Sequence, residues 1–247
     1  MILGLLYEGL GDTLADKKRT LTIERIYALA ELPGSLSFEE KIDHLRKFVH
    51  DNSDRTLNEE FYTKWENGGL ENDFLNYLEK RRQTPPPMEC TTRSGLLGAL
   101  LRHAGYTVRD VVAYNVNNNL SSHTFIEILN PDTGEWVAQD PDFNMIWRNK
   151  RTREPVSFAE VLGDIARHQP CLSAGCGWKK RDANGRTPER FRDDYQIASF
   201  IDRDKNERFT VYAPAFKPDT IFHYESRKAT FCELIEKNCR DGFFASQ

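Results

Sequence analysis

Three residues of this sequence, Cys90, His123 and Asp140, carry the side chains of a thiol nucleophile, a base and a carboxylate that could orient the base. A cysteine attacks a carbonyl group as its thiolate, so it needs an imidazole to take its proton and a third group to hold that imidazole. Cys90 follows Pro85-Pro86-Pro87 and precedes an apolar helical pattern, which predicts a helix that begins near the cysteine. The positive end of the helix dipole would stabilise a thiolate there, and Glu89 would oppose it if its carboxylate points toward the sulfur.

The sequence also predicts that His123 and Asp140 lie close together. Two strand-like stretches, 122–129 and 135–140, are separated by residues with the composition of a hairpin turn. In an antiparallel hairpin the numbers of facing residues have a constant sum, and an odd sum places His123 and Asp140 on one face. An even sum would place them on opposite faces. Asp142 has the same parity as Asp140 and is the reserve candidate.

Periodic apolar residues predict the elements that must position these side chains. We expect helices at 37–52, within 57–82, from Cys90 to a stop at Gly105, at 157–167 and at 230–238, and strands at 107–115, 122–129, 135–140 and 208–213. Ser37 and Ser157 are the expected N-caps, and Glu160 stands at the capping-box position of the second. Helices come first, a helix followed by three strands comes next, and a mixed tail ends the chain. This order does not alternate as in a doubly wound sheet, so the expected class is α+β.

Length and composition exclude several classes of protein. The 247 residues suffice for one large domain or two small ones, and the net charge of −4 argues against a general nucleic-acid binder. No apolar run approaches the roughly 20 residues that cross a bilayer, so no membrane partner is expected. The 15 Phe, 9 Tyr and 4 Trp residues argue against intrinsic disorder. Oligomeric state stays open.

The cysteines and the N-terminus predict a reducing, cytoplasmic location. Residues 1–6 are apolar but short and lack a basic region before them, which is unlike a signal peptide. Five cysteines are too few for a disulfide scaffold. For Cys171, Cys176, Cys232 and Cys239 we expect free thiols first, a disulfide second and a zinc site, with His168 and His223 as spare ligands, third. We assign no metal site and expect no cofactor.

Two further features of the sequence allow two interpretations each, and a third segment is expected at the periphery of the fold. Trp136 and Trp147 could line a substrate cleft, although aromatic residues near a hairpin more often belong to the core. The basic run from Arg148 to Arg153 is most often a solvated loop, but it could hold an anionic group of a substrate. Segment 179–194 is polar and lacks periodic apolar residues, so we expect a peripheral, mobile loop.

From about Leu45 to Phe143 the chain resembles the transglutaminase-like superfamily of cysteine enzymes. The resemblance rests, in chain order, on the helix Lys41–Asn52, on Glu89-Cys90 opening a helix with Gly98-Ala99-Leu100-Leu101, on Gly105-Tyr106-Thr107-Val108-Arg109, on His123-Thr124-Phe125-Ile126-Glu127-Ile128, and on Thr133-Gly134-Glu135-Trp136-Val137-Ala138-Gln139-Asp140-Pro141. Each piece alone is weak, whereas all of them in this order and spacing are fairly specific.

The resemblance implies a papain-like core in which a nucleophile-bearing helix packs on an antiparallel sheet. It implies one domain over 1–247, with a core at about 36–150, an N-terminal segment 1–35 and a C-terminal elaboration 151–247. Members of the superfamily attack acyl groups, commonly amides, through a thioester and release them to water or to an amine. By resemblance, Cys90 is the nucleophile, His123 the base and acid, and Asp140 the orienting group. The substrate would then be a peptide, a protein or a small amide.

The chain departs from the superfamily pattern around the cysteine. Met88 stands where many members have glycine, and Thr91 and Thr92 follow the cysteine where many have an acidic residue. Gln83 is the only glutamine near enough upstream to be the oxyanion donor, and the backbone N–H of Cys90 is the alternative donor. These departures put the substrate in doubt and leave a second hypothesis, a catalytically degenerate binding module that keeps the fold without the chemistry.

Overall fold

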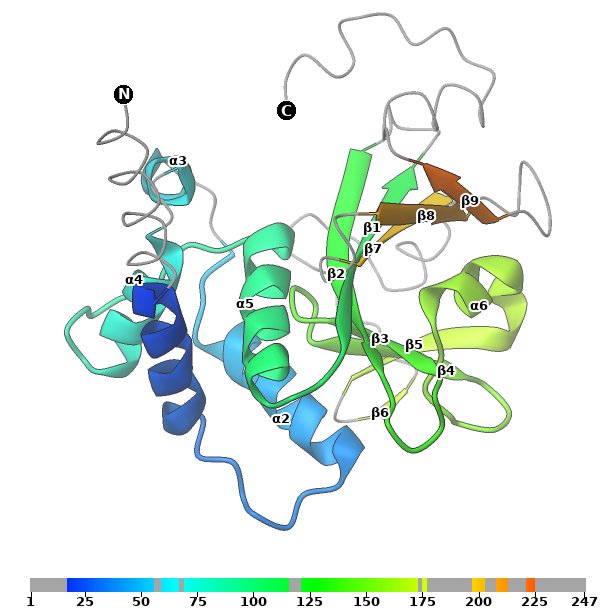
Figure 1. The fold of residues 1–247 in the computed structure, drawn as a ribbon, viewed down its shortest axis with the longest axis horizontal. Coiled ribbons are helices and arrows are strands. Elements are labelled where there is room, and N and C mark those ends of the chain that lie inside the picture. Colours follow the sequence, from blue (N-terminus) through cyan, green and yellow to red (C-terminus); the bar gives the residue numbers. More distant parts are fainter. Residues whose placement is uncertain are drawn as a thin grey trace, which may run out of the picture. The chain divides into compact units, whose positions relative to one another are not determined.

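The structure, a computed structural model, describes residues 17–55, 59–66, 69–115, 121–172, 175–176, 197–202, 208–212 and 221–224. The chain divides into two compact units, Met1–Tyr106 and Thr107–Gln247, and each is described by itself below (Figure 1). The expectation of one domain over the whole chain stays a prediction.

The first unit is helical. Residues 17–29 form a helix, and they are followed by α2 (Phe38–Asp51), α3 (Glu59–Glu66), α4 (Leu70–Leu78) and α5 (Cys90–His103). The predicted helices at 37–52 and from Cys90 are confirmed, and the periodic region 57–82 contains α3 and α4. Ser37 caps α2 in a capping box, in which the Glu40 carboxylate accepts the Ser37 N–H at 2.9 Å. None of the described helices is long and apolar enough to cross a membrane.

The end of α5 follows the sequence closely. Ala104 is the C-cap, and Gly105 has φ +85°, a left-handed conformation that glycine adopts without strain. The N–H of Tyr106 then donates to the carbonyl oxygen of Leu101 at 3.0 Å, which satisfies an orphan carbonyl of the last turn. The predicted stop at Gly105 is confirmed.

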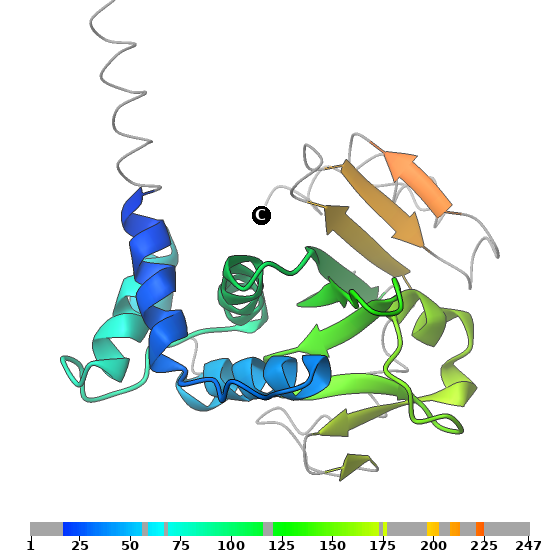
Figure 2. The same cartoon turned by 60° about the horizontal axis from the view of Figure 1, so that its bottom comes forward.

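The second unit is built on an antiparallel sheet, which has nine strands among the described residues (Figure 2). The strands are β1 (Val108–Asn115), β2 (Ser121–Leu129), β3 (Trp136–Asp140), β4 (Met145–Asn149), β5 (His168–Leu172), β6 (Gly175–Cys176), β7 (Ile197–Asp202), β8 (Arg208–Tyr212) and β9 (Ile221–Tyr224). Their order in the sheet is β6-β5-β4-β3-β2-β1-β7-β8-β9. The α+β class and the predicted strands β1, β2, β3 and β8 are confirmed, whereas the other five strands were not predicted.

The register of the β2–β3 hairpin has the predicted parity. Ile126 faces Gln139 and Leu129 faces Trp136, so the sum of facing residue numbers is odd. The turn closes with a 2.8 Å hydrogen bond from the N–H of Asn130 to the carbonyl oxygen of Glu135. His123 and Asp140 therefore project from the same face of the sheet.

The helix α6 (Phe158–Gly163) packs against one face of this sheet. Its apolar side chains share a buried core with strand residues, namely Val111, Ala113, Phe125, Ala138, Met145, Trp147, Ala198 and Phe200. Ser157 and Glu160 form the expected capping box. The helix predicted to reach residue 167 ends at Gly163, because Asp164 leaves the helical conformation before a short 3₁₀ turn, η1 (Ile165–Arg167). Trp147 is fully buried, so its assignment to the core is confirmed.

For Cys171 and Cys176 the first expectation, free thiols, was wrong. Cys171 and Cys176 face each other across the β5–β6 hairpin and form a disulfide, so this pair provides neither free thiols nor zinc ligands. Disulfides are rare in reducing compartments, and the cytoplasmic expectation loses the support it took from these cysteines. Cys232, Cys239, the predicted helix 230–238 and the segment 179–194 lie outside the described residues.

Candidate active site

Cys90 is the first residue of α5, and the start of this helix is held by the residue before it. Glu89 is the N-cap, and its Oε1 accepts the backbone N–H groups of Thr91 at 2.9 Å and Thr92 at 3.2 Å. In return, Thr92 Oγ1 accepts the N–H of Glu89 at 2.9 Å. Cys90 itself is half-buried and its thiol is free. The expected position of the cysteine at a helix N-terminus is therefore confirmed.

The Glu89 carboxylate also contacts the sulfur. Its second oxygen, Oε2, accepts a hydrogen bond from Cys90 Sγ at 2.8 Å. The dipole of α5 favours a negative charge on the sulfur, whereas the adjacent carboxylate opposes it. In the structure, the Glu89 carboxylate thus points toward the sulfur, the orientation in which it disfavours a thiolate.

The segment that leads to Cys90 is fixed by two sets of contacts within the first unit. Asp54 pairs with it through the backbone, donating to the oxygen of Pro86 at 2.9 Å and accepting the N–H of Met88 at 2.7 Å. Arg93, buried in the first turn of α5, donates to the hydroxyl group and the carbonyl oxygen of Ser53, each at 2.9 Å. Both sets of contacts tie the residues that follow α2 to the segment around Cys90, so the backbone is held both before and after the cysteine.

The two candidate oxyanion donors differ in their placement. Gln83 is exposed, in a bend upstream of the buried residues Pro86 to Met88. The N–H of Cys90 belongs to the first turn of α5, where backbone N–H groups have no partner within the helix. The backbone N–H of Cys90 is therefore held in place by the helix, whereas Gln83 lies exposed in a bend.

His123 and Asp140 form a buried pair in the second unit. His123 Nε2 lies 2.8 Å from Asp140 Oδ2, and the two residues are 3% and 0% exposed. The other carboxylate oxygen, Oδ1, accepts the N–H groups of Asp142 at 2.9 Å and Phe143 at 3.2 Å. Asp140 is thus fixed through both oxygens. The reserve candidate, Asp142, contributes a backbone donor to Asp140, and it is Asp140 that accepts the hydrogen bond from His123.

The contacts of the imidazole define its tautomer and orientation. A carboxylate oxygen at Nε2 requires the proton on that nitrogen, so in the neutral ring Nδ1 carries the lone pair. Aromatic rings flank the imidazole, with centroids at 5.2 Å for Phe143 and 5.9 Å for Phe125. This arrangement suits a base that accepts a proton at Nδ1 while Asp140 stabilises the resulting positive charge.

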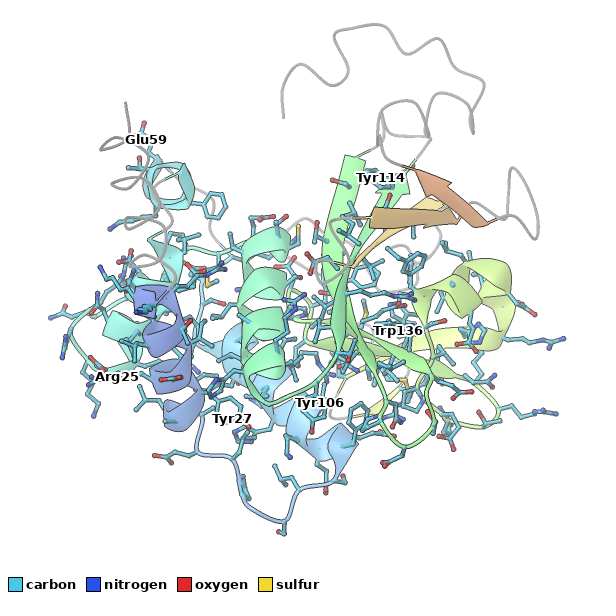
Figure 3. All side chains as sticks on the ribbon, viewed as in Figure 1. Arg25, Tyr27, Glu59, Tyr106, Tyr114 and Trp136 are labelled. Carbon is cyan, nitrogen blue, oxygen red and sulfur yellow. A yellow bond between two sulfur atoms is a disulfide. The ribbon has the colours of Figure 1, made fainter. Side chains whose placement is uncertain are left out.

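A buried glutamate on the same face of β2 was missed by the sequence reasoning. Glu127 is 0% exposed. Its Oε2 accepts a hydrogen bond from Arg109 Nε at 2.7 Å, and its Oε1 accepts one from the N–H of Phe158, at the start of α6, at 2.6 Å. The Arg109 guanidinium lies 4.1 Å from the ring of Trp136 (labelled in Figure 3) and 4.5 Å from that of Phe200. The only signal in the sequence is that Arg109 and Glu127 face each other once β1 and β2 are paired. The cluster of Arg109, Glu127, Trp136 and Phe200 ties α6 to the sheet.

Glu127 gives the stability of the fold a specific pH dependence. Burial raises the pKa of the Glu127 carboxyl group, and the Arg109 charge and the hydrogen bonds from Phe158 and Arg109 offset the effect only in part. The folded protein therefore holds this proton more tightly than the unfolded chain does. We expect Glu127→Gln to remove this dependence, so that wild type loses stability relative to the variant as the pH rises from about 4, the value of a glutamate in the unfolded chain, through the raised pKa of the folded state. Urea unfolding of both proteins across this range measures the difference, and a relative gain by wild type would contradict the prediction.

The basic run after β3 has ordinary surface contacts. Arg148 donates to the carbonyl oxygen of Arg153 at 2.8 Å, and Lys150 donates to that of Ala166 at 2.7 Å. Residues 150–154 are exposed, which supports the interpretation as a solvated loop.

Cys90 and the His123–Asp140 pair belong to different units. Cys90 lies in the first unit, and His123 and Asp140 lie in the second. Comparison with models of known protein families finds no match, and no curated protein has significant sequence similarity to the chain. The chemical interpretation therefore rests on the residues and their contacts.

Proposed function

We propose that this protein is a cysteine-dependent acyl-transfer enzyme with a transglutaminase-like core, acting on an amide or related acyl group through a thioester. Cys90 is the nucleophile, His123 the base and acid, and Asp140 the group that orients the imidazole. The observation that carries the proposal is the buried 2.8 Å contact between His123 Nε2 and Asp140 Oδ2, with Asp140 Oδ1 held by two backbone N–H groups.

The proposed reaction follows from these contacts. His123 Nδ1 takes the thiol proton as the Cys90 sulfur attacks the carbonyl carbon, and the N–H of Cys90 donates to the oxyanion that forms. The carbon–nitrogen bond then breaks, and the imidazolium returns its proton to the leaving amine. Water or a second amine attacks the thioester and gives a proton to His123, and this proton returns to sulfur as the carbon–sulfur bond breaks. Asp140 stays ionised and stabilises the imidazolium throughout.

The burial of the pair favours catalysis over a degenerate binding module. Taking an imidazole and a carboxylate out of water costs free energy unless both are well hydrogen-bonded. A binding module has no need for such a pair, and paired titratable groups in fixed, buried geometry are typical of active sites. Cys90 at a helix start supplies the nucleophile that this pair requires.

The test is direct capture of the covalent intermediate. We would mix wild type with 4-nitrophenyl acetate, which gives nitrophenolate as the leaving group, quench in acid, and map the acetylated residue by mass spectrometry. We expect one acetyl group on Cys90, and none on that peptide in Cys90→Ala. Adding a simple amine during turnover would then show whether the acyl group passes to water or to the amine. Acetylation confined to lysines, at the same level in Cys90→Ala, would favour the binding module.

A further inference from the structure

Glu89 has a contact that the proposed reaction does not use. Its carboxylate caps α5 through Oε1, and through Oε2 it accepts the hydrogen bond of the Cys90 thiol at 2.8 Å. N-caps are usually Ser, Thr, Asp or Asn, whose short side chains reach only the helix N–H groups. The longer glutamate here divides its two oxygens between the helix and the nucleophile.

The position of the proton in this contact follows from general chemistry. A free carboxylate binds a proton about 10⁴-fold more weakly than a free thiolate does. Oε1 already accepts two backbone N–H groups, as the acceptor-only oxygen of an ionised carboxylate does. The shared proton therefore stays on sulfur, and the negative charge of Glu89 faces the thiol.

We propose that Glu89 is a positioning residue that keeps the resting nucleophile as a thiol. This inference rests on the proposed function, because it assigns the state from which Cys90 reacts. The nucleophile then loses its proton to His123 only as the sulfur attacks, and no thiolate–imidazolium pair forms beforehand. A thiol at rest is also a poor target for alkylating agents and oxidants, since the thiolate is the reactive form.

Other charged groups lie near the start of α5, and a substitution at Glu89 leaves them unchanged. On α5 itself, Arg93 donates to Ser53, and on the neighbouring segment Asp54 pairs with the backbone before Cys90. His123, the proposed base, belongs to the second unit. A Glu89→Gln substitution changes none of these groups, and its amide oxygen can still accept the N–H groups of Thr91 and Thr92. It therefore removes the charge beside the sulfur and keeps the cap.

The experiment compares the alkylation of Cys90 in three proteins. Iodoacetamide labelling from pH 5 to 9, followed by peptide mapping, gives the rate at Cys90 for wild type, Glu89→Gln and the control Glu40→Gln. Glu40 is also a first-turn carboxylate of a helix, α2, that accepts a backbone N–H. At pH 6.5 we expect Glu89→Gln to react about tenfold faster than wild type, with its pH profile displaced to lower pH, because a charge next to the sulfur has been removed. Glu40→Gln should match wild type.

An unchanged or slower rate in Glu89→Gln would overturn the inference. A second measurement reads the thiolate directly: its absorbance, taken as the difference from Cys90→Ser, should appear at lower pH in Glu89→Gln than in wild type. Thiolate absorbance with the same pH dependence in both proteins would overturn the inference. Failure here differs from failure of the proposed function, since an acetylated Cys90 with unchanged labelling in Glu89→Gln removes only the role of Glu89. A faster-labelling variant without any acyl-enzyme removes the enzyme instead.

Discussion

Replacing Asp140 by asparagine should lower the rate of acyl transfer by about 10³- to 10⁴-fold, the size of effect that follows when an imidazole is held in the wrong tautomer. In this site the orientation of the asparagine amide would be set by the contacts of Asp140 Oδ1, which accepts the N–H groups of Asp142 and Phe143. The single amide oxygen of asparagine is needed there, so its NH₂ group must face His123 Nε2. The imidazole then carries its proton on Nδ1 and cannot accept one from the thiol.

Two measurements test this prediction. The turnover of 4-nitrophenyl acetate gives the rate, and the ¹⁵N chemical shifts of the His123 ring report which nitrogen is protonated. Asp132→Asn is the matched control, because Asp132 is an exposed carboxylate in the β2–β3 turn and should leave both readouts unchanged. A full rate in Asp140→Asn would remove Asp140 from the mechanism.

The Phe125→Ala substitution should reduce the free energy of unfolding by about 3–5 kcal/mol. Phe125 is 0% exposed and lies in the core beneath α6, where its ring meets that of Phe158 edge to face at 4.9 Å. Its removal leaves a cavity between α6 and the sheet and withdraws one of the rings beside His123. Urea denaturation at neutral pH measures the loss.

The controls for Phe125 separate volume from exposure. Phe125→Leu keeps most of the buried volume and should cost less than about 1.5 kcal/mol. Leu21→Ala, at a leucine that is 64% exposed, should change stability by no more than about 0.5 kcal/mol. A loss below 1 kcal/mol in Phe125→Ala would mean that the α6 core contributes far less than its burial implies.

Local rules were enough to predict the elements that carry the candidate site. The triple proline and the apolar stripe gave the start of α5 at Cys90, and glycine gave its end at Gly105. Hairpin parity placed His123 and Asp140 on one face without knowledge of the rest of the sheet. Each of these predictions depends on contacts between residues close in the chain, which leave a signal in the sequence.

What was missed depends on contacts between distant residues. The edge strands β6 and β9 are short, and their sequence signal is weak without their neighbours. The contacts of Glu127 require β1, β2 and α6 together, so its burial has no local signature. For Cys171 and Cys176 the spacing alone left three outcomes open, and only the tight β5–β6 hairpin, in which the two residues face each other, selected the disulfide.

The strand order has a consequence for how the second unit folds. Neighbours in the described sheet are consecutive in the chain, with β1 and β7 as the exception. Consecutive strands can pair by closing short loops, whereas β1 and β7 meet only after the chain from Asn115 to Ile197 has closed. We therefore expect β1 to β6 to form early, with His123 already beside Asp140, and the β1–β7 seam to close in the slow step. Substitutions at that seam would then alter the folding rate while leaving the His–Asp pair intact.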